Sequence, residues 1–124
     1  MLFATMAEIL LVGRGWQTRA LLRAQLIEEG LEVEAFETVG EALATAENVA
    51  LGPSLLVADL SSSKEPQKEI ERLAAWSGQV PIWIIAGRGL LADPQLKGRG
   101  FELILARPID MGQFVEQIKR RVRA

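Results

Sequence analysis

The fold of this chain follows from Leu55-Leu56-Val57-Ala58-Asp59, a short apolar run that ends in an acid. Four more runs of similar length flank it, namely Ile9-Leu10-Leu11-Val12, Val33-Glu34-Ala35-Phe36, Ile82-Trp83-Ile84-Ile85 and Leu103-Ile104-Leu105-Ala106. Most of these runs are continuously apolar and do not alternate with polar residues, which is typical of parallel strands buried on both faces. The pattern predicts five parallel strands in one sheet.

Helical patterns fill the segments between the runs. Apolar residues recur at spacings of three and four over 16–29, 39–48 and 66–76, and from Asp110 onward. In the first of these helices, Leu22 and Leu26 are expected on an inner face together with Ala20, Ala24 and Ile27. Gly30 is expected to end that helix, and Asp110 to cap the last one, with Gln113 at the capping-box position. Segment 90–97 holds Pro94, so any helix there is predicted to be short or kinked.

Composition restricts the chemistry of the chain. The 124 residues contain no cysteine and no histidine, and the formal net charge is −2. Disulfides, thiolate metal sites and the usual general base are therefore excluded, and the charge does not indicate a nucleic-acid-binding protein. The apolar stretches are too short to span a membrane. We expect a non-enzymatic cytoplasmic protein with neither nucleic acid nor membrane as a partner.

Charged residues follow the ends of the predicted strands. Gly13 and Arg14 follow the first strand, Asp59 ends the third, Arg88 follows the fourth, and Arg107 follows the fifth. The carboxyl ends of parallel strands meet at one edge of a sheet, where open α/β folds place their ligands. That edge is predicted to carry one carboxylate and up to three guanidinium groups.

An ordered set of motifs resembles a known family. It comprises Ile9-Leu10-Leu11-Val12, Leu22 to Leu26 to Gly30, Glu41-Ala42-Leu43, Pro53-Ser54-Leu55-Leu56-Val57-Ala58-Asp59-Leu60, Val80-Pro81-Ile82 and Arg107-Pro108-Ile109-Asp110. Together these residues resemble the receiver domain of bacterial two-component response regulators. The resemblance implies an α/β, flavodoxin-like (βα)5 fold, doubly wound around a five-stranded parallel sheet of order 2-1-3-4-5. It also implies a single domain over 1–124, and because receivers are often N-terminal modules, a longer regulator is compatible with it.

The family's phosphorylation site is carried over residue by residue. The phosphoacceptor aspartate aligns with Asp59, but Gly13 and Arg14 stand where receivers have the acidic pair that holds Mg²⁺. Ala86 replaces the Thr or Ser that binds the phosphoryl group, Ile104 replaces the aromatic switch residue, and Arg107 replaces the lysine. The resemblance therefore implies a complete scaffold with a degenerate site.

The substitution of an acid by Arg14 works against metal binding. Mg²⁺ requires several oxygen ligands, usually with more than one carboxylate. Two unit charges about 4 Å apart interact by roughly 4 kcal/mol at an effective dielectric near 20, so Arg14 turns attraction for the ion into repulsion. We expect no Mg²⁺ and no other cofactor. Asp59 is predicted to pair with Arg14, Arg107 or both, or to be satisfied by local amides alone.

The favoured interpretation is an atypical receiver, or pseudo-receiver, that signals through protein contacts. The resemblance places its interface, with a protein partner or a second copy, on segment 90–97, strand 103–106 and the last helix, with Leu90, Leu91 and Leu96 as exposed apolar residues. One alternative is an anion or nucleotide site formed by Arg14, Arg88 and Arg107, motivated by the Gly-Arg-Gly triplets at 13–15, 87–89 and 98–100. Another is weak phosphorylation of Asp59. Trp83 is expected to pack under a helix.

Overall fold

Five parallel strands form one sheet of order β2-β1-β3-β4-β5 in the computed structural model, which describes residues 7–48 and 52–123. The strands are β1 (Ile9–Gly13), β2 (Val33–Phe36), β3 (Leu55–Asp59), β4 (Ile82–Ala86) and β5 (Leu103–Ala106). The predicted flavodoxin-like fold and strand order are confirmed. Gly13 is in register with Asp59, and Ala86 with Ala106, so the strand ends meet at one edge as expected.

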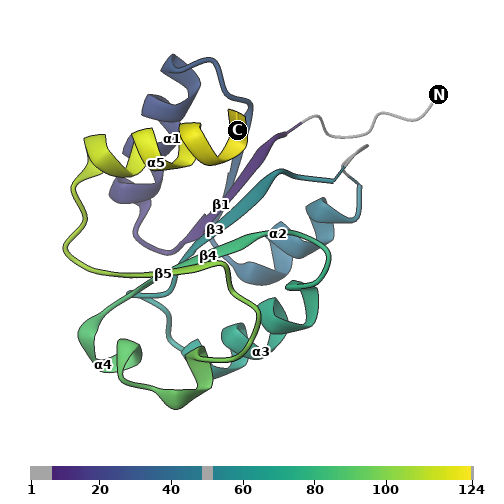
Figure 1. Cartoon of the computed structure of the whole chain (residues 1–124), viewed down its shortest axis with the longest axis vertical. Helices are drawn as coiled ribbons and strands as arrows, with labels where there is room; N and C mark the ends of the chain where they lie inside the picture. Colours follow the sequence, from purple (N-terminus) through teal and green to yellow (C-terminus); the bar gives the residue numbers. More distant parts are fainter. Residues whose placement is uncertain (1–6, 49–51, 124) are drawn as a thin grey trace.

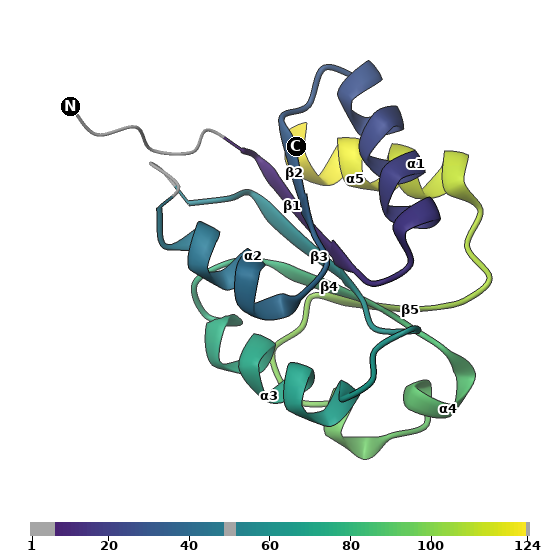
Figure 2. The same cartoon turned by 180° about the vertical axis from the view of Figure 1, so that it is seen from behind.

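The helices cover both faces of the sheet. They are α1 (Trp16–Glu28), α2 (Val39–Ala46), α3 (Pro66–Trp76), α4 (Arg88–Leu91) and α5 (Met111–Arg123), with a 3-10 turn η1 (Pro94–Leu96) between α4 and β5. Helices α1 and α5 lie on one face, and α2 and α3 lie on the other (Figures 1 and 2). Within the described residues, none of these helices has the length and apolarity needed to cross a membrane.

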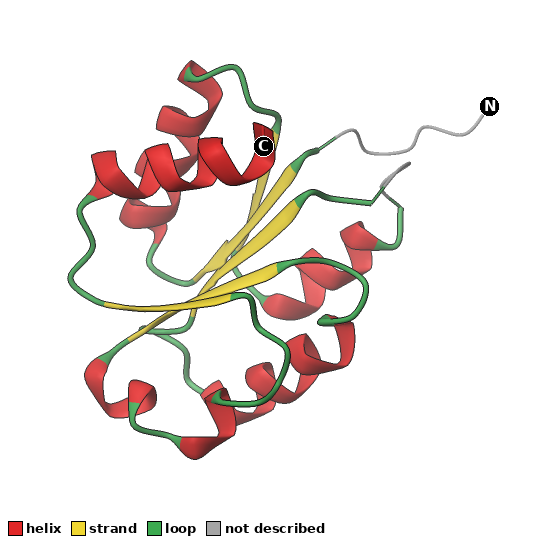
Figure 3. Cartoon of the chain, viewed as in Figure 1, coloured by secondary structure: helices red, strands yellow, loops and turns green. Residues whose placement is uncertain are grey.

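Two apolar cores result, one on each face of the sheet. Along β1, Leu10 and Val12 point into the core under α2 and α3, while Ile9 and Leu11 point into the core under α1 and α5. Strands with two buried faces need apolar side chains at every position. The central strands β1, β3 and β4 are accordingly buried almost throughout, and Figure 3 shows them between the two helical layers.

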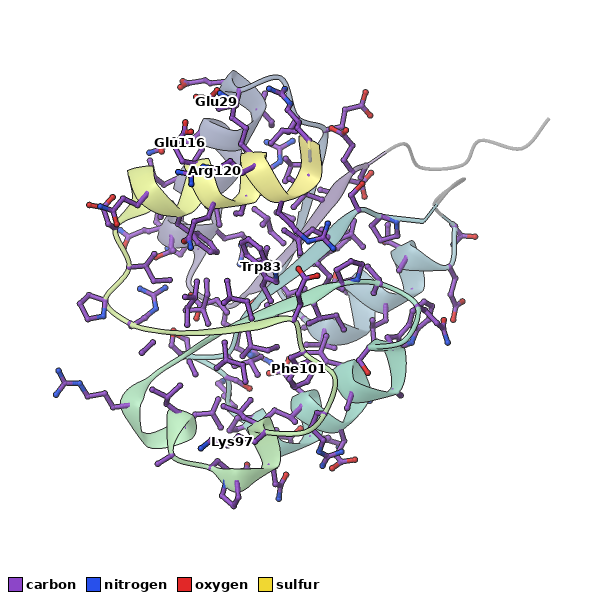
Figure 4. The ribbon with its side chains drawn as sticks, in the orientation of Figure 1. Glu29, Trp83, Lys97, Phe101, Glu116 and Arg120 are labelled. Carbon is purple, nitrogen blue, oxygen red and sulfur yellow. The ribbon has the colours of Figure 1, made fainter. Side chains whose placement is uncertain are left out.

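Trp83 of β4 is a core residue, as predicted. Its ring lies under α5 (Figure 4), 6.1 Å from the ring of Phe114 between centroids, and 5% of the residue is exposed. The indole N–H donates to Glu102 Oε2 at 2.7 Å. A tryptophan buried in this way needs a partner for its N–H group, and the partly exposed Glu102 supplies one.

Local signals end and begin the helices as expected. Gly30 has φ +83° directly after α1, a conformation that favours glycine. Asp110 caps α5 by accepting the Gln113 N–H at 2.9 Å. Pro94 separates two short turns: α4 begins at Arg88, two residues before the predicted segment, and η1 begins at the proline itself.

Two burial predictions are wrong. Leu22 and Leu26 of α1 are buried, but Ala20, Ala24 and Ile27 face outward, and Ile27 is 43% exposed. The helix carries two apolar stripes, and only one of them can face the sheet. Leu96, predicted as a surface residue, is 2% exposed because η1 turns its side chain into the α2–α3 core.

Candidate functional site

Asp59 occupies the centre of the carboxyl edge, at the end of β3. Its side chain is 15% exposed. The Arg107 guanidinium donates to its Oδ2, and Ser61 donates both its backbone N–H (3.0 Å) and its hydroxyl to Oδ1. Both carboxylate oxygens therefore have partners from the chain itself, one cationic and the other neutral.

Arg107 reaches Asp59 from the end of β5, across β4. Its backbone N–H donates to the Ala86 carbonyl at 3.1 Å, which continues the pairing of the two strands beyond Ala106. The Arg107–Pro108 peptide bond is cis. The guanidinium Nη2 meets the carboxylate, while the buried Nε has no hydrogen-bond partner within the described residues. Of the two predicted partners for Asp59, the structure shows Arg107.

Gly13, the last residue of β1, and Arg14, which follows it, supply no carboxylate to this site. Among the described residues, Arg14 forms no ion pair with Asp59, and its Nη1 lies 4.0 Å from Glu37 Oε1. A Cβ built on Gly13 would lie 3.4 Å from Asp59 Cβ, so any side chain at this position would contact Asp59. The backbone at Gly13 is therefore close to Asp59, and the Gly13 carbonyl accepts a hydrogen bond from Arg19.

Arg19 is a site residue that the sequence analysis missed. Its Nη1 donates to the Gly13 carbonyl from the first turns of α1. The signal was the helical period: Arg19 precedes Leu22 by three residues and Leu26 by seven, which places it on the buried face of α1. A second guanidinium thus lies at the end of β1, held by a backbone oxygen.

The two residues predicted at the switch positions are apolar and are buried or partly buried. Ala86 is fully buried at the end of β4, and Ile104 of β5 packs against the core under α2 and α3. Neither side chain offers a hydroxyl or an aromatic ring. A change at Asp59 therefore has no polar group at position 86 through which it can act.

This donor set does not fit Mg²⁺. The ion needs several oxygen ligands in near-octahedral geometry, yet the Asp59 oxygens and the Gly13 carbonyl are engaged by Arg107, Ser61 and Arg19. Across residues 7–48 and 52–123, no group of three or more His, Cys, Asp or Glu side chains could hold a metal ion.

The three arginines of the alternative anion site have different surroundings. Arg107 pairs with Asp59, whereas Arg14 lines a hollow between α2 and α3 that contains neither Arg88 nor Arg107. Arg88 is exposed at the start of α4. In the triplet 98–100 both glycines have positive φ, +72° and +86°, and Arg99 pairs with Glu71. That triplet forms a turn tied to α3.

A separate polar cluster anchors α5. Arg121 makes two hydrogen bonds to Glu102, at 2.7 and 2.8 Å, and Trp83 donates to the same carboxylate. The Arg121 guanidinium, with a smaller contribution from the Trp83 indole, holds the pKa of Glu102 below its usual range despite partial burial. Lys119 joins α5 to α1 through Glu29 at 2.9 Å. These contacts stabilise the scaffold away from the Asp59 edge.

Several solved structures with similar folds are receiver domains. A CheY-like response regulator receiver domain from Methanospirillum hungatei JF-1 has 22% identity and a TM-score of 0.75, over 96% of this chain and 95% of that one. A receiver domain from Clostridium thermocellum has 17% identity and a TM-score of 0.76, over 94% of each chain. The non-phosphorylated HemR receiver domain from Leptospira biflexa has 21% identity and a TM-score of 0.73, over 95% of each.

The sequence matches no family model and none of the curated proteins. The likeness to solved structures therefore establishes the fold, which is that of response regulator receiver domains.

Proposed function

We propose that this chain is an atypical receiver domain, a non-enzymatic cytoplasmic module that signals through protein contacts without Mg²⁺-dependent phosphorylation. The observation that carries the proposal is the state of Asp59. Arg107 pairs with one of its carboxylate oxygens, and Ser61 donates twice to the other. The receiver fold supports the signalling role, and the occupied carboxylate supports the departure from the usual chemistry.

Phosphorylation of Asp59 would require a free carboxylate oxygen as the nucleophile. Transfer of a phosphoryl group depends on positioning and on cations that neutralise charge in the transition state, chiefly Mg²⁺. Here attack through Oδ2 must first break the pair with Arg107, and attack through Oδ1 must displace Ser61. The residues beside Asp59 supply no second carboxylate for the ion. We infer that the ion pair with Arg107 keeps Oδ2 of Asp59 occupied.

Ala86 and Ile104 point to the same conclusion. A receiver response needs a group that binds the new phosphoryl oxygen and a side chain that relays the change. The buried Ala86 methyl cannot donate a hydrogen bond. Ile104 is packed into the core under α2 and α3, so its position is set by apolar contacts. The domain is proposed to work as a fixed binding surface.

The proposed output surface is the face formed by α4, β5 and α5, which would bind a protein partner or a second copy. Leu91 is 38% exposed there, and Arg120 is exposed and forms no ion pair within the described residues. Figure 4 shows Arg120 on the outer side of α5. Leu96 is not available to a partner, and Lys119 is engaged by Glu29.

The first experiment is an amide NMR titration with Mg²⁺ and then with Mg²⁺ plus beryllofluoride, which imitates an aspartyl phosphate. The wild-type amides of Gly13, Asp59 and Ala86 are expected to stay unshifted at millimolar additions. The matched variant Gly13→Asp/Arg14→Asp/Arg107→Lys restores the acids and the lysine, and its Asp59 amide is expected to shift with Mg²⁺. Wild-type shifts that extend from Asp59 to Ile104 would establish the phosphorylation alternative instead.

The second experiment addresses the output surface. Light-scattering mass is compared between the wild type, Arg120→Glu and Leu91→Ser, with the exposed Trp16→Ser of α1 as the control. A wild-type dimer that dissociates in the first two variants and persists in the control supports the α4–β5–α5 interface. Dissociation in Trp16→Ser alone would move the interface to α1, and a monomeric wild type removes the second copy as the partner.

A further inference from the structure

A second feature of the carboxyl edge lies apart from Asp59. A hollow of about 300 Å³ opens between the loops that follow β1, β2 and β3, above the first turns of α2 and α3. Figure 2 shows these two helices side by side on one face of the sheet. The hollow contains none of Asp59, Arg88 and Arg107, so its chemistry is independent of the phosphoacceptor-equivalent site.

The charged lining of the hollow is predominantly basic. It consists of Arg14, Lys64, Lys68 and Arg72 against Glu65 and Glu69, which leaves an excess of two positive charges in a chain whose net charge is −2. Such local excess attracts anions even where the whole protein is acidic.

The two carboxylates in the lining are partly engaged elsewhere. The Ser63 hydroxyl donates to Glu69, and Glu65 lies 3.8 Å from Lys68 in an exposed pair. Among the described residues, neither Lys64 nor Arg72 forms an ion pair. These cations therefore rely on solvent or on a ligand for their counter-charge.

The arrangement of the cations works against the stability of α3. Lys68 and Arg72 are four residues apart in α3 (Pro66–Trp76), so they lie along one side of the helix, and Lys64 lies in the loop just before it. Like charges four residues apart on a helix destabilise it by a few tenths of a kcal/mol per pair. An anion bound between them would remove that repulsion.

The Arg72 guanidinium lies close to the backbone of α2 at Gly40. A Cβ built on Gly40 would lie 3.2 Å from Arg72 Nη1, so glycine at this position makes room for the guanidinium. The Thr38 hydroxyl and the Glu41 carboxylate form the capping box of α2 at the same place. Arg72 thus reaches across from α3 to the first turn of α2, while Arg14 approaches from the β1–α1 loop.

We propose that this hollow binds the phosphate groups of a small phosphorylated molecule. Its volume lies at the lower end of the range for small-molecule sites. Two guanidinium groups and two ammonium groups match a group with two or more negative charges, because arginine donates in a fork that fits phosphate oxygens. A single carboxylate would leave most of these donors without a partner.

The test is an amide NMR titration of the whole chain with inorganic pyrophosphate, with chloride adjusted to keep the ionic strength constant so that screening is equal throughout. Phosphate and a nucleoside diphosphate form parallel arms, which distinguish binding of the phosphate groups alone from binding of a larger ligand. In each arm, the amides of Gly40, Lys64 and Lys68 are expected to shift together and to saturate.

The deciding variant is Lys68→Gln/Arg72→Gln, and Lys97→Gln/Arg88→Gln is the control because it removes the same charge outside the hollow. Pyrophosphate affinity is expected to fall about tenfold or more in the first and to stay within about twofold in the second. Equal losses in both variants, or no saturating shift with any of the three anions, would overturn the proposal. In both variants, the amides far from the substituted residues should keep their wild-type chemical shifts, which checks that the variants are folded.

Discussion

Asp59 and the basic hollow lie on the same edge of the sheet, yet the charge of Asp59 is paired within the chain and part of the positive charge in the hollow is not. Asp59 receives a guanidinium and two further hydrogen bonds from Arg107 and Ser61. In the hollow, four cations face two carboxylates, and Lys64 and Arg72 have no ion-pair partner within the described chain. The difference lies in the number of partners that the chain itself supplies to each charged group.

Burial explains the difference. The Asp59 side chain is 15% exposed, and a carboxylate in that position must be paired because its hydration is largely lost. Lys64 and Lys68 are exposed on the loop before α3 and on its first turn. Water solvates their ammonium groups at little cost, so the fold tolerates Lys64 without an acidic partner and Lys68 with only the exposed Glu65.

The largest expected effect concerns the pair between Asp59 and Arg107. Arg107→Gln should lower the free energy of unfolding by about 2 kcal/mol, because it leaves a mostly buried carboxylate without its cation. Urea denaturation at pH 7 measures the loss. The double variant Asp59→Asn/Arg107→Gln should recover part of it, since a neutral amide needs no cation. If the single variant lost no more stability than Lys64→Gln, the contrast between the two regions would not hold.

An intermediate effect is expected at Glu102, another acid whose carboxylate accepts hydrogen bonds from within the chain. Its folded pKa is lowered, chiefly by Arg121, so its contribution is complete above the ordinary Glu pKa and is lost as the pH falls through the folded value. Glu102→Gln should cost on the order of 0.5–1 kcal/mol at pH 7, allowing for solvent screening. The stability of wild type and variant should converge in acid. A difference that is independent of pH would assign the effect to packing around Trp83.

The smallest effect is expected in the hollow. Lys64→Gln and Arg72→Gln should each change the free energy of unfolding by less than about 0.5 kcal/mol, with a slight gain being the expected sign, because each removes repulsion between like charges. Thermal unfolding at low ionic strength makes that gain easiest to detect. Lys119→Gln is the matched comparison, since it removes a cation that pairs with Glu29 and should therefore destabilise. If Arg72→Gln lowered the free energy of unfolding by more than about 1 kcal/mol, the Arg72 guanidinium would be stabilising the fold itself, and the contrast with Asp59 would fail.

The strands and their order were predictable because their signals are local or shared with a known family. Apolar runs of four or five residues predict buried strands wherever they fold, and the ordered motifs indicated the receiver topology. The approach of Arg107 to Asp59 was predictable for the same reason, since both follow strand ends on one edge. Arg14 was predicted as a partner of Asp59 on the same ground, but it lies in the loop after β1, where its Nη1 is 4.0 Å from Glu37 Oε1.

By itself, the sequence determined the parallel sheet and brought Asp59 and Arg107 to the same edge of it. Only the tertiary structure decided which stripe of α1 faces the sheet, that Leu96 enters the core, that Arg19 donates to the Gly13 carbonyl, and that Arg72 and Arg14 line one hollow beside α2. The physical reason is that periodicity and composition are properties of one segment. The packing of a helix or the gathering of charges from three loops depends on how segments distant in the chain are placed together.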